Sequence, residues 1–299
     1  HYTISLTKFG QRMALIYEII HGTHEDRCEN VTFSYTGSNA SATMTWKRND
    51  ESELSDVEIK ITDLLPDQSI LSQRKDPDRY PEITFLSEQF NQILIYRDWS
   101  FGRMSPPRLP QPTDAPIDFL QEDCNNLGMM LNNLLHRGLR KTLLSYLSRF
   151  YAPIEDIGVS VVGGTAQIFL HERGSSKPIP ATRLSDGTLR FLCLLAILCH
   201  PEPPPVVCLE EPELGMHPDV MPILAELLIQ ASERTQLFVT THSADLVAEL
   251  SHIPEAVVVC ERDAAGTRMQ RLEADKLAEW LERYTLGDLW RMGEIGGTL

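Results

Sequence analysis

Short apolar runs separated by helix-length segments dominate the chain from Val206 onward. The runs are Val206 to Leu209, Leu237 to Thr240 and Val257 to Cys260, and an amphipathic pattern starts at Pro218 between the first two. Proline is favoured in the first turn of a helix, and strands that alternate with helices are typical of βαβ units. This part of the chain therefore predicts an α/β fold with a parallel sheet and flanking helices.

The beginning of the chain has a different pattern. Up to about residue 62, alternating or β-branched and aromatic stretches are separated by turn-prone clusters; they include Tyr2 to Leu6, Met13 to Ile20 and Val31 to Tyr35. Such short, evenly spaced runs predict an antiparallel sheet or meander. Gln92 to Tyr96 is a further short apolar run and is expected to form a buried strand.

The middle of the chain predicts a connector, two helices and a hairpin. Five prolines between residues 103 and 118 exclude any regular element there. Residues 119–150 show two apolar stripes at helical spacing, with a break at Gly138. Residues 157–171 are expected to form a hairpin that turns at Gly163 and Gly164.

These patterns divide the chain into three expected parts. Residues 1–102 form a β-rich N-terminal lobe that is incomplete, and residues 103–156 form a Pro-rich connector and helical insertion. Residues 157–299 form the lobe that carries the motifs described below. Because the sequence opens at His1 within a strand-like alternation, we expect further sequence upstream.

Composition excludes some classes of protein. The 299 residues carry a formal net charge of −15, which argues against a broadly basic surface that coats nucleic acid. None of the six cysteines forms a C-x-x-C pair, so a zinc or redox site is not indicated. Reduced cysteines, with neither a signal peptide nor a membrane-spanning stretch, favour a cytoplasmic location.

The run Val206 to Leu209 ends abruptly in Glu210, Glu211, Pro212 and Glu213. Ligands of parallel sheets bind at the carboxyl ends of the strands. A carboxylate there can hold Mg²⁺, which prefers oxygen ligands, and a second can orient or deprotonate a water molecule. In the competing interpretation, these acids face solvent and cap the helix that starts at Pro218.

Two further segments place polar groups near an expected helix or strand end. Ser185, Asp186 and Gly187 precede an apolar helix whose N-terminus could receive a phosphate, although a segment of this kind taken alone is more often only the cap of a core helix. Leu237 to Thr240 ends in Thr241, His242 and Ser243, and the imidazole could contact a phosphate or a positioned water. A lone histidine after a strand is more often structural.

The order and spacing of the segments LSDGT, LEEPE and TTHS resemble the ABC-type ATPase heads of the RecF/SMC-like group of predicted AAA-family ATPases. In that group the three segments are the signature loop, Walker B and the switch histidine. Tyr80 to Thr84, Ile95 to Arg103 and Leu286 to Trp290 are similar to the same group. The resemblance implies a P-loop NTPase fold that binds ATP and Mg²⁺.

The resemblance also implies a role for each site residue. Glu210 would hold Mg²⁺, in a position where the wider superfamily usually has Asp. Glu211 would polarise the attacking water, and His242 would contact the γ-phosphate. Ser185, Asp186 and Gly187 would face nucleotide held by a second subunit, so that ATP is sandwiched in a homodimer.

One part of such an enzyme is missing, because the sequence contains no G-x-x-x-x-G-K-[ST] loop. The nearest string, Arg140-Lys141-Thr142, lacks the preceding glycine and lies in an expected helix. We therefore expect the P-loop to have been lost by truncation or encoded elsewhere, and the chain alone to bind ATP poorly and to be nearly inactive.

Three functions are compatible with these observations. The first is an ATPase head that works with DNA or a companion effector protein, in DNA repair or maintenance or in phage defence. The second is a non-enzymatic binding module that keeps the fold without the P-loop. The third is a metal-dependent nuclease built on Glu210, Glu211 and Glu213, which ranks last because the only other acidic cluster is Glu261-Arg262-Asp263.

Overall fold

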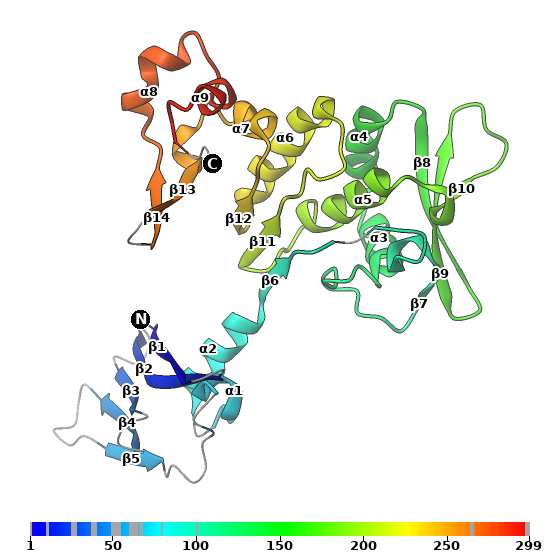
Figure 1. The fold of residues 1–299 in the computed structure, drawn as a ribbon. Helices are drawn as coiled ribbons and strands as arrows, with labels where there is room; N and C mark the ends of the chain where they lie inside the picture. The colour runs from blue at the N-terminus through cyan, green and yellow to red at the C-terminus, as the bar shows by residue number, and fades with distance from the viewer. Residues whose placement is uncertain are drawn as a thin grey trace. The chain divides into compact units, whose positions relative to one another are not determined.

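The computed structural model describes residues 2–9, 12–24, 29–36, 41–48, 55–59, 65, 68–78, 80–99, 101–263 and 266–296. The chain divides into two compact units, His1–Gln92 and Ile93–Leu299 (Figure 1). The first unit is β-rich, and the second contains all three motif segments.

The first unit is built on an antiparallel meander, as the alternating pattern predicts. Its strands are β1 (Tyr2–Phe9), β2 (Arg12–His24), β3 (Glu29–Thr36), β4 (Ser41–Arg48) and β5 (Ser55–Ile59), each paired with the next. Helices α1 (Ile70–Gln73) and α2 (Pro81–Asn91) follow. The buried carboxylate of Glu18 on β2 accepts hydrogen bonds from Tyr2 Oη at 2.7 Å and Ile70 N at 2.9 Å, and so ties α1 to the sheet.

The second unit contains the predicted parallel sheet. Strand β11 (Val206–Glu210) lies between β6 (Ile93–Tyr96) and β12 (Gln236–Thr240), and both pairings are parallel. The expected strands at 92–96, 206–209 and 237–240 are therefore confirmed. Because all three strands run in the same direction, their carboxyl ends lie at one edge of the sheet.

The two faces of this sheet differ in burial. Val207 and Leu209 point into the core and are almost inaccessible. On the opposite face, Ile95 is 46% exposed and Phe238 is 55% exposed. Parallel sheets are usually covered on both faces, whereas the described residues of the second unit cover only one face of this sheet.

Helix α5 (Asp186–Leu198) is the centre of the core. Every residue from Leu189 to Leu198 is buried, as expected for a helix that is apolar nearly all round. It packs against α3 (Leu127–His136) and against α6 (Met221–Ser232), which also contacts β12. A short 3₁₀ turn, Pro218–Val220, precedes α6, so the helix expected at Pro218 is present.

A second sheet carries the predicted hairpin. Strands β8 (Ile154–Val162) and β9 (Thr165–Glu172) turn at Gly163 and Gly164, and β9 also pairs with β7 (Gln111–Pro112) and β10 (Ile179–Pro180). Helices α3 and α4 (Arg140–Phe150) pack on β8. The parallel sheet with flanking helices, the antiparallel lobe and the helical insertion together confirm the predicted α/β fold.

The helix predicted from residue 119 starts later than expected. Cys124 has a left-handed backbone conformation (φ 58°), which interrupts a helix. The Asn126 side chain donates to the carbonyl oxygens of Pro116 at 2.7 Å and Phe119 at 2.8 Å. Such side-chain bonds to the backbone compete with helix formation, and α3 begins only at Leu127.

The strand predicted at Val257 to Cys260 is present, but its predicted place in the parallel sheet is wrong. Strand β13 (Val258–Asp263) pairs antiparallel with β14 (Gly266–Arg271) in a separate two-stranded sheet. The partner strand follows within three residues, so little chain entropy is lost when this hairpin closes. Helices α8 (Ala274–Leu281) and α9 (Leu286–Met292) complete the C-terminal part, and α9 packs on α7 (Ala244–Glu249).

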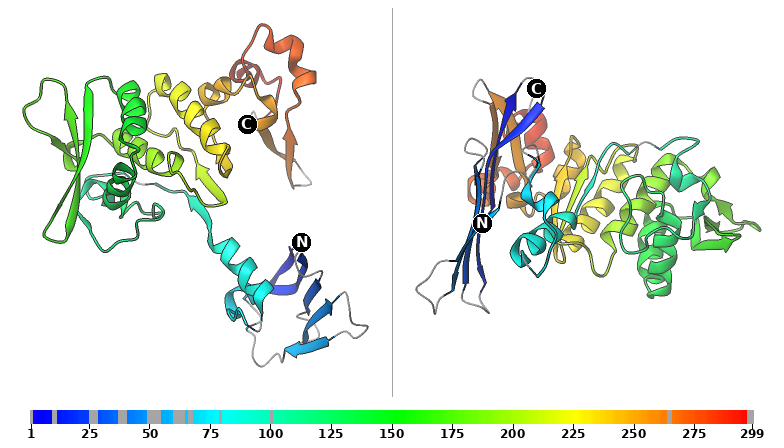
Figure 2. Two further views of the ribbon diagram at one scale, coloured as in Figure 1. Left: turned by 180° about the vertical axis from the view of Figure 1, so that it is seen from behind. Right: turned by 90° about the horizontal axis from the view of Figure 1, so that it is seen from below.

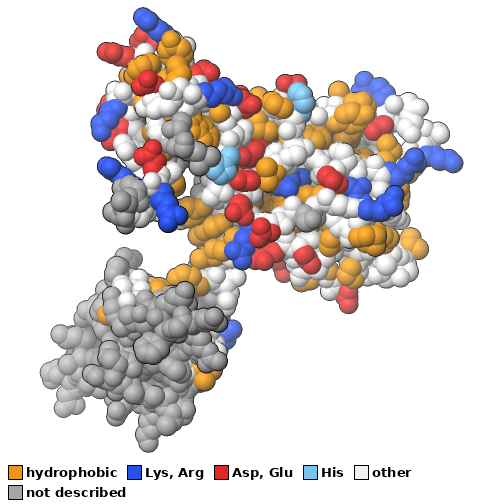
Figure 3. Space-filling view, viewed as in Figure 1, with side chains coloured by type: hydrophobic (Ala, Val, Ile, Leu, Met, Phe, Trp, Pro, Cys, Tyr) orange, Lys and Arg blue, Asp and Glu red, His pale blue; other side chains and the backbone are white. Residues whose placement is uncertain are grey.

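Figures 1 and 2 show the order of these parts within the second unit. The β7–β10 sheet lies at one end, the helices around α5 and the parallel sheet lie in the middle, and the β13–β14 hairpin with α8 and α9 lies at the other end. On the face of this unit seen in Figure 3, acidic and basic side chains are interspersed. No helix among the described residues is both long and apolar enough to cross a membrane.

Gly187 should be intolerant of even a methyl side chain. A Cβ at this position would lie 2.9 Å from the carbonyl oxygen of Gly215. Alanine is a better helix former than glycine by up to about 1 kcal/mol, but backbone overlap costs about 1–3 kcal/mol. We therefore expect Gly187→Ala to lower the free energy of unfolding, as measured by denaturant titration.

Gly158 on β8 is the matched control for this substitution, because a Cβ there has nothing within 4 Å. Gly158→Ala should leave the unfolding midpoint close to that of the wild type. A Gly187→Ala protein as stable as the wild type would show that the contact with Gly215 does not constrain the fold.

His200, which follows α5, should make stability depend on pH. Burial lowers the pKa of its imidazole below the ordinary 6.5. Nδ1 accepts a hydrogen bond from Glu202 N at 3.2 Å, and Nε2 is buried with no partner among the described residues. The unfolded chain therefore binds a proton more readily, so stability is highest above about pH 6.5 and falls as the pH drops below it.

The substitution His200→Asn keeps an acceptor near Nδ1 but cannot be protonated. It should flatten the fall in melting temperature between about pH 7 and pH 5. His252→Asn is the control, since His252 is exposed. An unchanged pH profile in His200→Asn would rule out His200 as the source.

Candidate active site at the strand ends

The carboxyl ends of β11 and β12 bring the acids and the histidine together. In the parallel register Glu210 lies opposite Thr240, and Glu211 N donates a 2.9 Å hydrogen bond to the Thr240 carbonyl oxygen. His242 Nε2 lies 3.5 Å from Glu211 Oε1. Glu211 and His242, which are 31 positions apart in the sequence, thus form one pair at the sheet edge.

This pair is open to solvent on the histidine side. The His242 side chain is 86% exposed, and that of Glu211 is 29% exposed. The imidazole is therefore accessible to a ligand, while the carboxylate beside it is more sheltered. A partly sheltered carboxylate next to an exposed imidazole can orient a water molecule and contact an anionic group at the same time.

The backbone of Glu211 is strained. Its φ of 42° lies in the left-handed region, which non-glycine residues seldom adopt and which costs of order 1–3 kcal/mol. Asp98, just after β6, shares this conformation with a φ of 52°. The two left-handed residues thus lie just after neighbouring strands of the parallel sheet. Their conformation sets the direction in which the backbone leaves β6 and β11.

Glu213 fixes the loop that carries His242. Its Oε1 accepts hydrogen bonds from Thr241 Oγ1 and, at 3.3 Å, from His242 N. The residue is buried, and its Oε2 has no hydrogen-bond partner among the described residues. The loops after β11 and β12 are therefore joined by a buried carboxylate.

The capping interpretation of the acids does not match this geometry. The helical segment that begins at Pro218 is capped by His217, whose Nδ1 accepts from Asp219 N at 3.3 Å. Glu213 instead bonds to the loop after β12. Glu211 and Glu213 thus make their contacts at the edge of the sheet rather than with the following helix, while Glu210 faces solvent.

Arg190 is a charged residue inside the apolar helix α5. It is buried, and its guanidinium donates to the carbonyl oxygens of Trp99 at 3.1 Å and Glu211 at 3.4 Å. It also lies over the rings of Trp99 and Phe101, at 5.7 and 5.1 Å from their centroids. Burial lowers its pKa from the ordinary value. Arg190 thus holds together the loops that follow β6 and β11.

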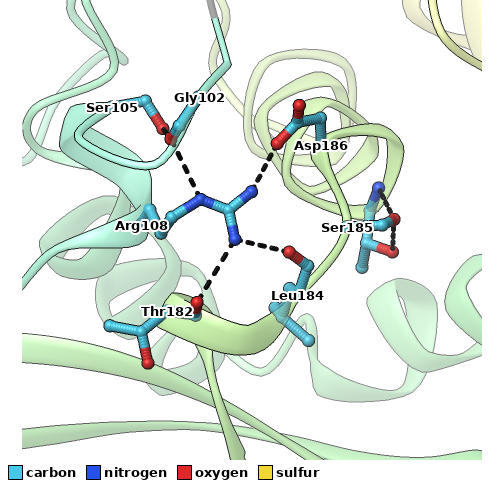
Figure 4. Close-up of polar contacts among 8 residues, drawn as sticks. Gly102, Ser105, Arg108, Thr182, Leu184, Ser185 and Asp186 are labelled. Carbon is cyan, nitrogen blue, oxygen red and sulfur yellow. Dashed lines mark hydrogen bonds and ion pairs between the residues drawn. The ribbon is translucent and has the colours of Figure 1, made fainter.

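The segment predicted as a signature loop, Leu184 to Thr188, forms the N-terminus of α5. Ser185 Oγ accepts from Thr188 N at 3.0 Å and so caps the helix. Ser185 is exposed, and Asp186 forms an ion pair with Arg108 (Figure 4). The close approach of Gly187 to Gly215 places the start of α5 beside the loop that follows Glu213.

Glu210 can serve Mg²⁺ only together with other ligands. Its side chain is exposed at the end of β11, and the described residues contain no group of three His, Cys, Asp or Glu side chains able to hold a metal ion. Mg²⁺ is usually held by one or two carboxylates plus substrate phosphates and water. The single carboxylate therefore fits a metal shared with a nucleotide, but does not fit an all-protein metal site.

The roles of Arg190 and Glu213 were not predicted from the sequence, although the sequence contains a signal for Arg190. Arg190 is the one charged residue between Leu189 and Leu198, and a buried charge needs several partners. As part of the acidic run, Glu213 is expected from the sequence to hold a metal or to cap the next helix, whereas in the structure it bonds to the loop after β12. Arg108 has no comparable signal, because it lies among the prolines of the connector.

Comparisons with solved structures return head domains of SMC proteins. The SmcHead bound to the C-winged helix domain of ScpA is 12% identical, covers 88% of this chain and 76% of that chain, and gives a TM-score of 0.44. The SMC head domain from Thermotoga maritima is 12% identical, covers 86% and 74%, and gives 0.38. The Smc head from Pyrococcus furiosus bound to the C-terminal domain of ScpA is 11% identical, covers 89% and 80%, and gives 0.41. TM-scores this low establish neither activity nor partners.

No curated protein matches the chain in sequence. A family model described as "AAA domain, putative AbiEii toxin, Type IV TA system" matches residues 43–248, which is more than half of the chain and includes all three motif segments. The AAA-family membership expected from those motifs is thereby confirmed. The chain belongs to this AAA-domain family.

Proposed function

We propose that this chain supplies the hydrolytic and signature parts of an ATPase that sandwiches ATP between two subunits. The observation that carries the proposal is the pair of Glu211 and His242, 3.5 Å apart at the ends of adjacent parallel strands. In an open parallel sheet this edge is the ligand-binding edge. The strained backbone of Glu211 supports the proposal, since such strain is concentrated at functional sites.

Each side chain has a part in the proposed reaction. Phosphoryl transfer to water depends on positioning and on charge stabilisation more than on covalent chemistry. Glu211 orients the attacking water and accepts its proton, and His242 donates a hydrogen bond to the γ-phosphate. Glu210 is the protein ligand of Mg²⁺, which when bound neutralises phosphate charge.

The signature residues act toward the nucleotide of the other subunit. Ser185 and Gly187 present the N-terminus of α5, whose free N–H groups and positive dipole end favour an anion. Ser185 is exposed, which leaves it within reach of a second subunit. Because the 299 residues contain no P-loop, the loop that cradles the phosphates comes from outside this sequence.

We extend this proposal to the biological role of the protein. The matched family model is described as a putative toxin of a type IV TA system. We propose a role in phage defence, with DNA repair or maintenance as the alternative. The net charge of −15 and the interspersed surface charges argue for local rather than broad contact with DNA. A companion effector protein and a cytoplasmic location complete the proposal.

A non-enzymatic binding module is the second candidate, and the absence of a P-loop from this sequence favours it. Such a module would keep the strand-end contacts for structural reasons. It would neither hydrolyse ATP nor change its oligomeric state when ATP is added.

The decisive substitution is Glu211→Gln in the natural full-length protein. Removing the base should slow ATP hydrolysis by about 10²-fold or more, while a dimer that holds Mg²⁺ and ATP accumulates. Hydrolysis is measured by phosphate release and the dimer by light scattering after gel filtration.

Glu233→Gln is the control, because Glu233 is an exposed acid just after α6. It should hydrolyse ATP like the wild type. Wild-type turnover in Glu211→Gln would refute the assignment of Glu211, and a full-length wild type without any ATPase activity would support the binding module.

A further inference from the structure

Arg108 lies under the signature loop and comes from the Pro-rich connector. It ends the 3₁₀ turn η2 (Pro106–Arg108), and its side chain is only 11% exposed. The guanidinium faces the start of α5, as Figure 4 shows. A residue 78 positions before Asp186 thus reaches the predicted phosphate-facing loop.

The guanidinium uses each of its nitrogens. Nε donates to the Gly102 carbonyl oxygen at 3.0 Å, and Nη1 donates to the carbonyl oxygens of Leu184 at 2.5 Å and Thr182 at 3.4 Å. Nη2 pairs with the Asp186 carboxylate. The planar, multidentate donor set of arginine suits this arrangement, whereas a lysine ammonium could not reproduce it.

The ion pair with Arg108 reduces the repulsion between the Asp186 carboxylate and an anionic ligand at the loop. A carboxylate in the first turn stabilises a helix through the dipole, but it repels an anionic ligand at the same N-terminus. The Asp186 side chain is 58% exposed, so its charge would act on any phosphate that approached Ser185. The paired guanidinium cancels that charge where the ligand would arrive.

We propose that Arg108 is a positioning residue that both holds the backbone of the signature loop and neutralises Asp186, so that the loop can accept phosphate. This proposal rests on the proposed function for its ligand. The two effects of Arg108 are separable, because the carbonyl contacts fix the conformation of the loop and the carboxylate contact sets its charge.

Positioning is tested without nucleotide, by hydrogen–deuterium exchange of the full-length protein. In Arg108→Met, the amides of residues 184–189 should exchange about tenfold faster or more, because local opening becomes easier when the carbonyl contacts are lost. Arg173→Met is the control, since Arg173 forms an exposed ion pair with Glu155 away from this loop. Unchanged exchange in Arg108→Met would overturn the positioning role, whatever the protein does with ATP.

The neutralisation of Asp186 by Arg108 is tested by the stability of the dimer that Glu211→Gln forms with Mg²⁺ and ATP. In that background Arg108→Met should weaken the dimer about tenfold or more, the factor expected when a carboxylate is left unpaired beside an anion. Adding Asp186→Asn should recover most of the loss while exchange at residues 184–189 stays fast. Arg108→Lys restores the positive charge without the carbonyl contacts. It should therefore also form a stable dimer while the amides of residues 184–189 exchange fast.

If Asp186→Asn does not improve the dimer of Arg108→Met, neutralisation is overturned and only backbone support remains. If the Glu211→Gln protein with Arg108 intact forms no dimer with ATP, the proposed function fails instead. The exchange experiment then still decides whether Arg108 holds the loop.

Discussion

Burial of α5 from Leu189 to Leu198 is the constraint on which the second unit depends. A helix with apolar residues on every side can be stable in water only if other elements surround it. Here α3 and α6 pack on α5, and the same hydrophobic core includes Val207 and Leu209 of the parallel sheet. Because the helix cannot rotate or slide without exposing leucines, its N-terminus is fixed next to the carboxyl ends of the strands.

Three buried charged side chains then hold the loops of the candidate site in place. Arg190 joins the loops after β6 and β11, Glu213 joins the loops after β11 and β12, and Arg108 joins the connector to the start of α5. Burying a charge is costly unless it is well hydrogen-bonded, and both arginines bond mainly to backbone carbonyl oxygens. For the two arginines the cost is therefore offset by contacts that hold loop backbone, which is what a preorganised site requires.

The described residues of the second unit cover only one face of the parallel sheet, although its βαβ sequence pattern is typical of a sheet covered on both faces. Its exposed face carries Ile95 and Phe238, which lie on neighbours of the central strand β11. The alternation in β11, with Val207 and Leu209 buried and Glu210 exposed, follows from this one-sided covering. The site therefore lies at the end of a layer supported from the α5 side.

The sequence by itself determined the elements whose signals are local. The runs at 206–209 and 237–240, the glycine turn of the β8–β9 hairpin and the serine cap of α5 follow from side-chain period, backbone freedom and capping chemistry, each of which acts within a few residues. It also placed Glu211 and His242 at strand ends, and with parallel strands that placement implies proximity.

Only the tertiary structure decided which distant groups meet. Arg108 reaches Asp186 across 78 positions, and Glu213 turns toward Thr241, because packing of α5 and the sheet brings their backbones together. The tertiary structure likewise decided that β13 pairs with its neighbour β14 and not with the parallel sheet. Contacts of this kind depend on which of several possible partners loses least chain entropy and buries most surface, and no local pattern of residues encodes that balance.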